Sequence, residues 1–342
     1  MASYDRIQLV NSETNSKPQP EDRLDRRRGL CSIVCTTYNH EKFSRAAIES
    51  IVSQDYRPLE IVVIDDGSTD RNVDVIRAAL ADSDVKNTLL TQKNTGNIAM
   101  NVNRALAAAR GEFVLLTSLD DMLLPSCISS KLSLMLEDPS LVMVGNSTMS
   151  EMDMSGKITR PEVRNPVFGN ENASCQDLRE IEFTTAGAFF MQGTVLRADC
   201  INAIDGYDED IEGDDLIVRT KVWNYLVSDP SLRCVFLRQP GFIYRKHGDN
   251  LHRNSLRQLR TLIDWRNRFF PERPLPAIAQ RRARSYISEC LTKHDHAGLQ
   301  KALELDPVMT EIYASYRYSW DFYRRSIKHA LRRILHSIRK RL

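Results

Sequence analysis

Short apolar runs alternate with helical patterns along most of the first 250 residues. The runs at 31–35 and 59–64 each stop abruptly at polar residues, and between them apolar side chains recur at helical spacing over 41–54. A strand, a helix and a second strand in this order predict a buried parallel pair. Because ligands bind outside the carboxyl ends of such strands, the two polar clusters predict a binding site.

The same alternation continues downstream. Helical patterns follow at 71–80, 98–110, 126–136 and 214–227. Strand patterns follow at 87–91, 112–117, 141–145, 188–196, 234–237 and 242–244. We expect loops over 146–185, where apolar runs are few, and helices only from 251 onward. This order predicts an α/β fold, a doubly wound and mostly parallel sheet with a C-terminal helical extension.

The length of 342 residues allows one large domain with an appendage. Residues 1–28 are polar, include two prolines and have no apolar stretch typical of a secretory signal, so we expect a disordered lead there. We assign the sheet domain to 29–250 and the helical region to 251–342. Seven cysteines without a CxxC pair suit a reducing cytosol and argue against a disulfide framework or a zinc site.

Charge is distributed unevenly along the chain. The formal net charge is +2, but residues 321–342 contain eight Lys or Arg and one acid, which leaves −5 for the other residues. Within 323–342 apolar residues recur at helical spacing, so this segment either lies on an anionic membrane surface or packs on the protein body. Nucleic acid is a poor candidate partner because the rest of the chain is acidic and has no nucleic-acid-binding motif.

Two adjacent acids, Asp120 and Asp121, follow the predicted strand at 112–117. Adjacent carboxylates repel unless something compensates their charge, and a pair at a strand end is typical of a Mg²⁺ or Mn²⁺ site that also binds phosphates. The alternative is a cluster that caps the next helix. A second acidic pair, Asp65 and Asp66, at the end of another predicted strand favours the metal hypothesis.

In their order and spacing, several motifs make the chain resemble the inverting nucleotide-sugar glycosyltransferases of family 2, which have the GT-A fold. The motifs are SIVCTTYN, SIVSQDY, EIVVIDDGSTD, NTGNIAMNVNRALAAARGEF, LDDMLLP, DGYDED and YRKHGDN. The resemblance covers roughly residues 30–250. A GxGxxG motif is absent, which argues against a dinucleotide-binding protein.

The resemblance implies which residues bind the nucleotide. Thr36 and Tyr38 should line the nucleotide site, and Asp66 should accept a hydrogen bond from the N3–H of uracil or thymine, with Asp65 supporting the turn. The alternative is that the segment 65–68 is only a turn before a helix. Asn94 and Gly96 match the segment of the family that passes near the sugar, and a plain loop is the alternative there.

For the metal, the resemblance implies Asp120, Asp121 and His247. The leading acid of the family's D-x-D-D motif is replaced by Ser118, so we assign Asp120 to ribose or metal and Asp121 to metal. His247 resembles a third metal ligand that some members place after the last strand, and neutral imidazole suits Mn²⁺. A histidine in a surface loop is the alternative.

The catalytic base should lie in the acid-rich segment 205–215. Family members usually have a Glu-Asp pair ahead of a helix, whereas this chain has EGDD at 212–215, so the register is ambiguous. Our candidates are Asp214, then Asp215, then Glu212. Capping of the following helix is the alternative role for each of them.

Together these features predict a metal-dependent inverting glycosyltransferase that uses a UDP- or dTDP-sugar. We expect the acceptor to be a cell-surface polysaccharide or lipid-linked glycan, and the location to be cytoplasmic, on the inner face of the plasma membrane if the tail binds it. The alternative is a non-catalytic member of the same fold that binds nucleotide sugar or serves as a scaffold. A nucleotidyltransferase is disfavoured because no Gly-rich loop follows the first strand.

Overall fold

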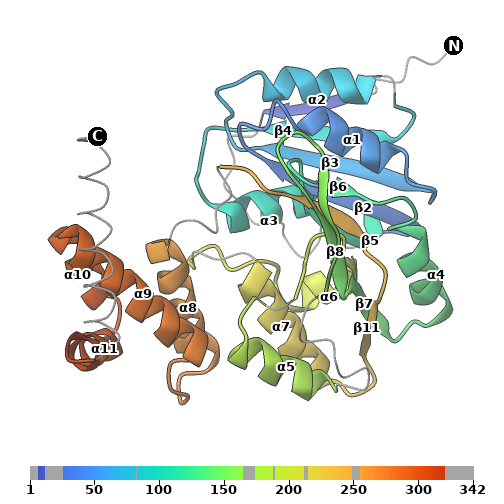
Figure 1. Cartoon of the computed structure of the whole chain (residues 1–342). Helices are drawn as coiled ribbons and strands as arrows, with labels where there is room; N and C mark the ends of the chain where they lie inside the picture. Colours follow the sequence, from blue (N-terminus) through green and yellow to red (C-terminus); the bar gives the residue numbers. More distant parts are fainter. Residues whose placement is uncertain are drawn as a thin grey trace, which may run out of the picture. The chain divides into compact units, whose positions relative to one another are not determined.

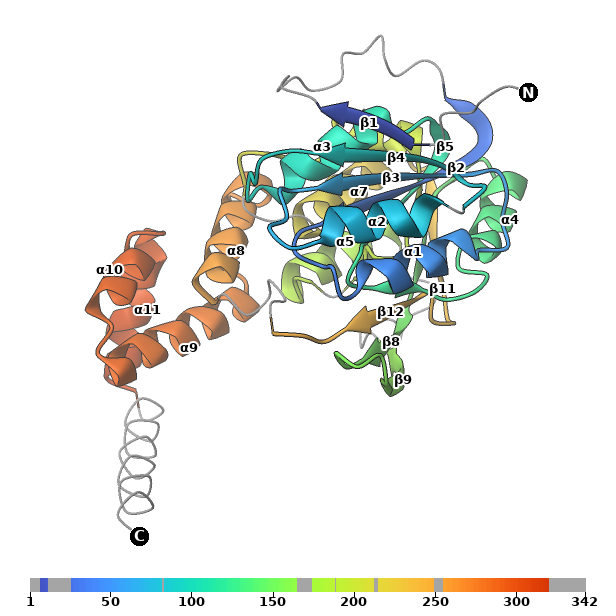
Figure 2. The same cartoon turned by 90° about the horizontal axis from the view of Figure 1, so that it is seen from above.

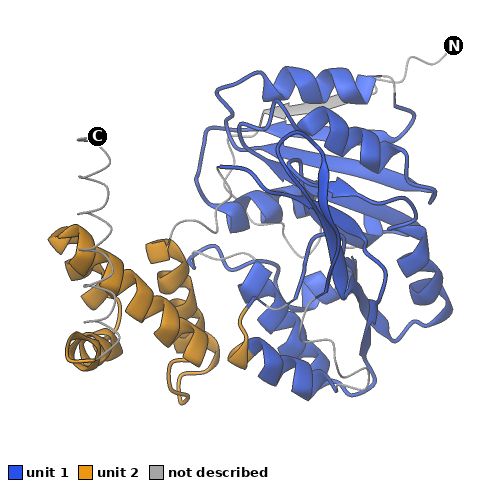
Figure 3. Ribbon diagram, viewed as in Figure 1, with its two compact units in different colours: residues 1–182, 187–250 blue, residues 183–186, 251–342 orange. Residues whose placement is uncertain are grey.

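A computed structural model describes residues 7–11, 26–81, 83–164, 174–187, 189–211, 215–248 and 255–319, and for 7–11 the main chain only. The chain divides into two compact units (Figure 3). The first comprises residues 1–182 and 187–250, and the second comprises 183–186 and 251–342. The basic segment 321–342, for which we expect either membrane binding or packing on the protein body, lies outside the described residues.

The first unit is built on an eight-stranded sheet with the order β1-β4-β3-β2-β5-β10-β7-β11. All adjacent pairs are parallel except those of β10, which runs antiparallel to both β5 and β7. The strands are β1 (Ile7–Asn11), β2 (Arg27–Thr37), β3 (Leu59–Asp65), β4 (Lys86–Thr91), β5 (Gly111–Ser118), β7 (Leu141–Asn146), β10 (Val195–Arg197) and β11 (Arg233–Leu237). The predicted mostly parallel sheet is confirmed.

Helices cover both faces of this sheet, with α1 and α2 on the opposite side from α3 (Figures 1 and 2). One core joins the sheet to α1 (Ser44–Val52), α2 (Asn72–Ala81) and α4 (Ser129–Glu137). The other joins it to α3 (Ile98–Ala108), α5 (Cys175–Thr184), α6 (Ala198–Ala203) and α7 (Asp215–Ser228). Ile33 and Val34, adjacent in β2, enter opposite cores, as the alternation of a strand requires.

A second, four-stranded sheet has the order β6-β12-β8-β9. Its strands are β6 (Met122–Leu123), β12 (Phe242–Arg245), β8 (Thr148–Met152) and β9 (Ile158–Arg164). The prediction of loops over 146–185 is therefore wrong, since β8, β9 and α5 lie there. These strands gave no apolar signal because β8 buries polar residues, Ser150 and Glu151, and β9 is largely exposed.

Two further predictions need correction. The strand expected over 188–196 is only Val195–Arg197, because Gly193 has a positive φ of 71° and the Thr194 amide bonds the carbonyl of Met191 in a turn. The disordered lead expected over 1–28 contains β1, which pairs in parallel with β4, and β2 already begins at Arg27. Pairing along the sheet edge satisfies main-chain groups that composition alone leaves without partners.

The second unit is helical in its described part, as the sequence predicts for 251 onward. Its helices are α8 (Ser255–Phe269), α9 (Ala277–Lys293), α10 (His296–Leu303) and α11 (Pro307–Arg317). Phe183, Trp265 and Phe270 form its aromatic cluster, with ring centroids 4.9–5.9 Å apart. Among the described residues, no helix combines the length and apolar character needed to span a membrane.

Candidate active site

The carboxyl ends of β2 and β3 form one wall of the candidate site. Thr36 pairs with Ile64 of β3 and with Ser118 of β5, so the strand ends meet at one edge of the sheet. Tyr38 lies just beyond and is 43% exposed. An exposed aromatic ring beside a strand end can stack on a ligand, so the predicted role of Tyr38 is compatible with its position.

Asp65 fixes the turn that follows β3. Its buried carboxylate accepts hydrogen bonds from the Ser68 amide (2.8 Å), the Ser68 hydroxyl (2.6 Å) and the Asn72 side-chain amide (2.8 Å). Gly67 completes the turn with a φ of 74°, and a Cβ there would lie 2.5 Å from the Asn94 nitrogen. The turn and the loop after β4 are therefore held against each other.

Asp66 holds the loop after β4. Its Oδ1 accepts hydrogen bonds from the Gln92 side-chain amide (2.7 Å) and from the amide (2.8 Å) and hydroxyl (3.0 Å) of Thr95. Its Oδ2 accepts the Gly96 amide at 3.1 Å. Asp66 is 6% exposed, whereas Asn94 and Gly96 are exposed. The two predicted sugar-side residues thus lie on a loop that Asp66 anchors.

The second acidic pair follows β5 and meets the end of β12. Asp121 is buried, and its Oδ1 accepts the main-chain N–H of Arg245 at 2.9 Å. Asp120 Oδ2 lies 3.0 Å from Nε2 of His247, and its carbonyl accepts a bond from the Arg245 side chain. The structure thus brings two of the three predicted metal ligands, Asp120 and His247, into contact, while the carboxylate of the third, Asp121, binds the main chain of Arg245.

The two acids have opposite pKa shifts. Burial would raise the pKa of Asp120, but hydrogen bonds from His247 and Ser118 and the charge of His40 together hold it below its ordinary value. Burial raises the pKa of Asp121 well above its ordinary value, and the negative charges of Asp120 and Asp215 add to this. A second negative charge is therefore unfavourable beside Asp120 unless a cation compensates it.

His40 belongs to the same cluster, although the sequence analysis did not select it. The potential ligand atoms of His40, Asp120 and His247 all lie within 4.8 Å of one another, and no other such group of three occurs among the described residues. The Nδ1 atom of His40 is buried and has no hydrogen-bond partner. A buried polar atom without a partner is costly, so it indicates a missing ligand. Two imidazoles and a carboxylate are a suitable donor set for a divalent metal.

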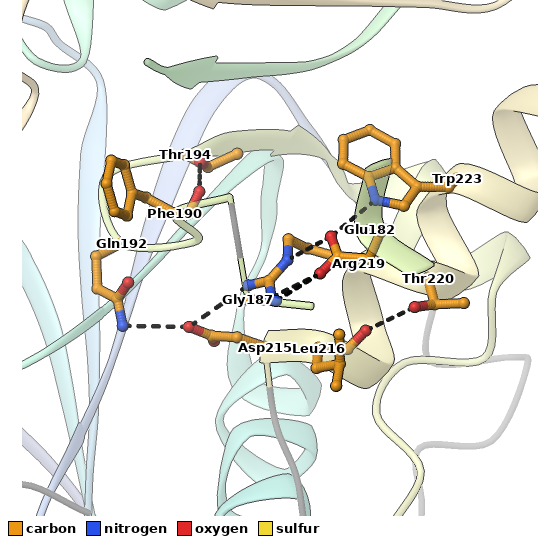
Figure 4. Close-up of polar contacts among 10 residues, drawn as sticks. All are labelled: Glu182, Gly187, Phe190, Gln192, Thr194, Asp215, Leu216, Arg219, Thr220 and Trp223. Atoms are coloured by element: carbon orange, nitrogen blue, oxygen red, sulfur yellow. Dashed lines mark hydrogen bonds and ion pairs between the residues drawn. The ribbon is translucent and has the colours of Figure 1, made fainter. Parts of the chain in front are cut away.

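The candidate base that the structure describes is Asp215, the first residue of α7 (Figure 4). Its Oδ2 lies 3.3 Å from the Gln192 side-chain amide and 3.9 Å from the Arg219 guanidinium. The Asp215 side chain is 31% exposed, so it can be reached by a substrate. Asp214 and Glu212, the other two candidates, lie outside the described residues.

Arg219, whose guanidinium lies 3.9 Å from Asp215, forms a buried ion pair with Glu182. Glu182 of α5 accepts two hydrogen bonds from the Arg219 guanidinium, at 3.0 and 3.2 Å, and both side chains are almost fully buried. Glu182 also accepts the indole N–H of Trp223 (3.1 Å) and the Gly187 amide (3.1 Å), as Figure 4 shows. This network fixes Arg219, and through it the start of α7. Sequence analysis missed Glu182 because its helix was interpreted as loop.

Comparisons with known proteins agree with this geometry. Residues 32–198 match the model of the family "Glycosyl transferase family 2". Residues 32–198 therefore form a domain of glycosyl transferase family 2, and the resemblance inferred from the motifs is confirmed.

Among curated relatives, glycosyltransferase GlyG of Streptococcus pneumoniae is 31% identical over 34% of this chain and 38% of its own length. An Escherichia coli relative, UDP-Glc:alpha-D-GlcNAc-diphosphoundecaprenol beta-1,3-glucosyltransferase WfgD, is 31% identical over 39% of this chain and 52% of its own. The chain thus spans about half or less of the length of these relatives.

Solved structures extend the likeness to most of the chain. Staphylococcus aureus TarS in complex with UDP-GlcNAc has a TM-score of 0.55 at 18% identity and covers 88% of this chain and 89% of its own. The mannosyltransferase PcManGT of Pyrobaculum calidifontis, in complex with GDP-Man and Mn²⁺, has a TM-score of 0.52 at 17% identity over 90% and 86%. At these identities the likeness concerns the fold, and the predicted GT-A class is confirmed.

Proposed function

We propose that this chain is a metal-dependent, inverting glycosyltransferase that moves a sugar from a UDP- or dTDP-sugar to a hydroxyl of a polysaccharide or lipid-linked acceptor. The observation that carries this proposal is the arrangement of acids at one edge of a family 2 domain. Asp66 follows β3, Asp120 and Asp121 follow β5, and the charge of Asp215 acts on Asp121. Acids are thereby available for three tasks: recognition of the nucleobase, metal binding and removal of a proton from the acceptor.

For donor recognition, we assign the binding of the nucleobase to Asp66. In the part of the chain that is described, its Oδ1 accepts three hydrogen bonds while Oδ2 accepts one, which leaves Oδ2 able to accept another. A carboxylate at this position favours a base that presents an N–H, as uracil and thymine do at N3. Tyr38 would stack on the base, and Thr36 would line the same wall.

For the leaving group we assign the metal to Asp120, Asp121 and His247, with Mg²⁺ or Mn²⁺ as the candidate ions. Bound there, a divalent cation would neutralise the negative charge that develops on the departing nucleoside diphosphate. Asp120 has a depressed pKa and is therefore ionised at neutral pH, the form that binds a cation. The solved complex of PcManGT with Mn²⁺ supports the choice of a divalent ion.

For proton removal we assign Asp215 among the described residues, with Asp214 and Glu212 as the other candidates. The carboxylate takes the proton of the acceptor hydroxyl while the hydroxyl oxygen forms its bond to the sugar C1 and the bond from C1 to the diphosphate breaks. General base catalysis of this kind contributes about 10²–10⁴-fold to the rate. Because Glu182 neutralises Arg219, the guanidinium can orient Asp215 without acting as an unpaired buried charge.

The names of two relatives support a lipid-linked acceptor. WfgD and a Campylobacter jejuni glucosyltransferase, 35% identical over 29% of this chain, are both named for transfer to sugars on diphosphoundecaprenol or PP-undecaprenol. We place the reaction on the cytoplasmic face of the membrane, with 321–342 as the proposed contact to anionic lipid. Co-sedimentation with anionic liposomes tests this contact, and binding that survives deletion of 321–342 would refute it.

A donor screen tests the proposal. The melting temperature is measured with UDP-, dTDP-, GDP- and CDP-sugars, each with Mn²⁺ and with EDTA, because a ligand that binds the folded state raises it. We expect a rise with uridine or thymidine donors in Mn²⁺ and a smaller rise in EDTA. Donor binding without transfer to any acceptor would favour the alternative, a non-catalytic nucleotide-sugar-binding protein.

A further inference from the structure

We propose that His40 is a further protein ligand of the divalent cation, beside Asp120, Asp121 and His247, and that the second imidazole it supplies makes the site prefer Mn²⁺ to Mg²⁺. The proposal deepens the proposed function, on which it rests for the presence of a metal at this edge of the sheet. It concerns a residue to which neither the motifs nor the paired acids had pointed. Three observations on His40 lead to it: its main chain is fixed, its ring is held by neighbouring rings, and one of its ring nitrogens is buried without a hydrogen-bond partner.

The main chain around His40 is fixed on both sides. Asn39 has a φ of 56°, its amide donates to the Ser68 hydroxyl at 2.8 Å, and its side-chain oxygen accepts the Thr69 amide at 2.8 Å. The carbonyl of His40 accepts the amides of Phe43 (2.8 Å) and Ser44 (3.0 Å) at the start of α1. Asn39 in the left-handed region and the hydrogen-bonded turn that follows it leave the main chain of His40 little freedom.

The ring of His40 is held by aromatic contacts. Its centroid is 6.2 Å from that of Phe43 and 6.0 Å from that of His247, which it meets edge-on, and the Phe43 and His247 rings are 5.3 Å apart. The Arg245 guanidinium covers Phe43, with 4.8 Å between its carbon and the ring centroid. The two imidazoles are thus positioned by packing, as metal-binding sites require of their ligands.

The buried ring nitrogen of His40 that has no hydrogen-bond partner indicates coordination of a metal. His40 Nδ1 is buried without a partner, and the ligand atoms of His40, Asp120 and His247 lie within 4.8 Å of one another. Ligand atoms about 2.0–2.2 Å from a metal lie about 2.8–3.6 Å from each other, so a movement of about 1–2 Å suffices to close the site.

The donor set determines the preference among ions. Mg²⁺ takes oxygen ligands and keeps several waters, whereas imidazole nitrogen suits first-row transition metals, of which Mn²⁺ binds it most weakly but still more readily than Mg²⁺ does. A second imidazole therefore strengthens Mn²⁺ binding much more than Mg²⁺ binding. Without His40, the site would consist of carboxylates and one imidazole and would discriminate less.

The affinity of the full chain for each metal alone, in the absence of nucleotide, tests the proposal. We expect His40→Gln to weaken Mn²⁺ binding, followed by the EPR signal of free Mn²⁺, by at least about 10-fold, and Mg²⁺ binding, followed by calorimetry, by much less. His296→Gln, which replaces an exposed histidine of α10, is the matched control and should change neither. His40→Asp should restore binding while reducing the preference for Mn²⁺. Unchanged Mn²⁺ affinity in His40→Gln, or an equal loss for both ions, would overturn the proposal.

A spectroscopic count of nitrogen ligands decides the matter even if the His40 variants fail to fold. Electron spin-echo modulation of Mn²⁺ bound to the unaltered protein should show two coordinated imidazole nitrogens, and a single one would contradict the proposal. Because neither measurement uses a sugar donor, failure of the metal site and failure of the glycosyltransferase assignment can be told apart.

Discussion

His247 Nε2 lies 3.0 Å from Asp120 Oδ2, although 127 positions separate the two residues in the chain. Asp120 follows β5 of the large sheet, while His247 follows β12 of the small one. The antiparallel pairing of β12 with β6, the two-residue strand directly after the acidic pair, brings them together. The small sheet thus places the imidazole of His247 beside the carboxylate of Asp120 at the edge of the large sheet.

The first prediction concerns Asp121, which is costly to bury in the absence of metal. The pKa of Asp121 is raised in the folded protein. Between its unfolded and its folded pKa, the native state therefore binds more protons than the unfolded state does. The free energy of unfolding consequently falls as pH rises through this window. In EDTA, Asp121→Asn should therefore raise the melting temperature by a few degrees at pH 8 and by less at pH 5, because asparagine retains an oxygen for the Arg245 amide. The same variant should lose metal-dependent transfer.

Melting curves in EDTA at both pH values measure this effect, with Asp74→Asn, an exposed acid of α2, as the control. If the stability of Asp121→Asn equals or falls below that of the unaltered protein at pH 8, the cost assigned to this carboxylate is wrong.

The second prediction concerns Asp66, which holds the loop after β4 and which we propose to bind the nucleobase of the donor. Asp66→Asn replaces one carboxylate oxygen by an amide that cannot accept the hydrogen bonds made by the acid. We expect UDP affinity, measured by calorimetry with Mn²⁺, to fall by about 10-fold or more, since a hydrogen bond to a charged group contributes about 1.5–3 kcal/mol. Affinity within twofold of the unaltered protein would rule out this role.

The third prediction concerns the buried pair of Glu182 and Arg219. Glu182→Gln removes the buried carboxylate that accepts two hydrogen bonds from the Arg219 guanidinium, and breaking such a buried pair costs about 3–5 kcal/mol. Urea unfolding should show a loss of this order, whereas Glu137→Gln, at an exposed position in α4, should change stability little. A loss below about 1 kcal/mol in Glu182→Gln would show that the network does not fix α7.

The fourth prediction separates the candidate bases. If Asp215 removes the proton, Asp215→Asn should lower kcat by about 10²–10⁴-fold with a smaller effect on donor KM. Asp199→Asn, an exposed acid in the first turn of α6, is the control for a helix-start acid without a catalytic task. Full transfer by Asp215→Asn would return the role to Asp214 or Glu212.

The sequence predicted the parallel core because its signals are local. The runs of β2 and β3 are continuous and apolar, and the helices between them keep a period near 3.6, so both their type and the polar strand ends could be recognised. The small sheet gave no such signal, since β8 buries Ser150 and Glu151 where alternation would require apolar residues.

The site was predictable where residues matched motifs and unpredictable where it depends on tertiary contacts. Asp66, Asp120 and Asp121 end strands, so their common edge follows from parallel topology. His40 lies in a loop without a characteristic spacing, and only the folding of β12 against β6 places His247 next to it. Glu182 acts through burial against Arg219, which no pattern of single residues reveals.

Transfer to a defined acceptor is the most direct test of the central claim. The full chain is incubated with a UDP- or dTDP-sugar, a sugar-diphosphoundecaprenol acceptor and Mn²⁺, and both the glycosylated lipid and the anomeric configuration of the new bond are determined. We expect a product of inverted configuration that disappears in EDTA and in Asp121→Asn. Equal product in EDTA, or retained configuration, would contradict the central claim.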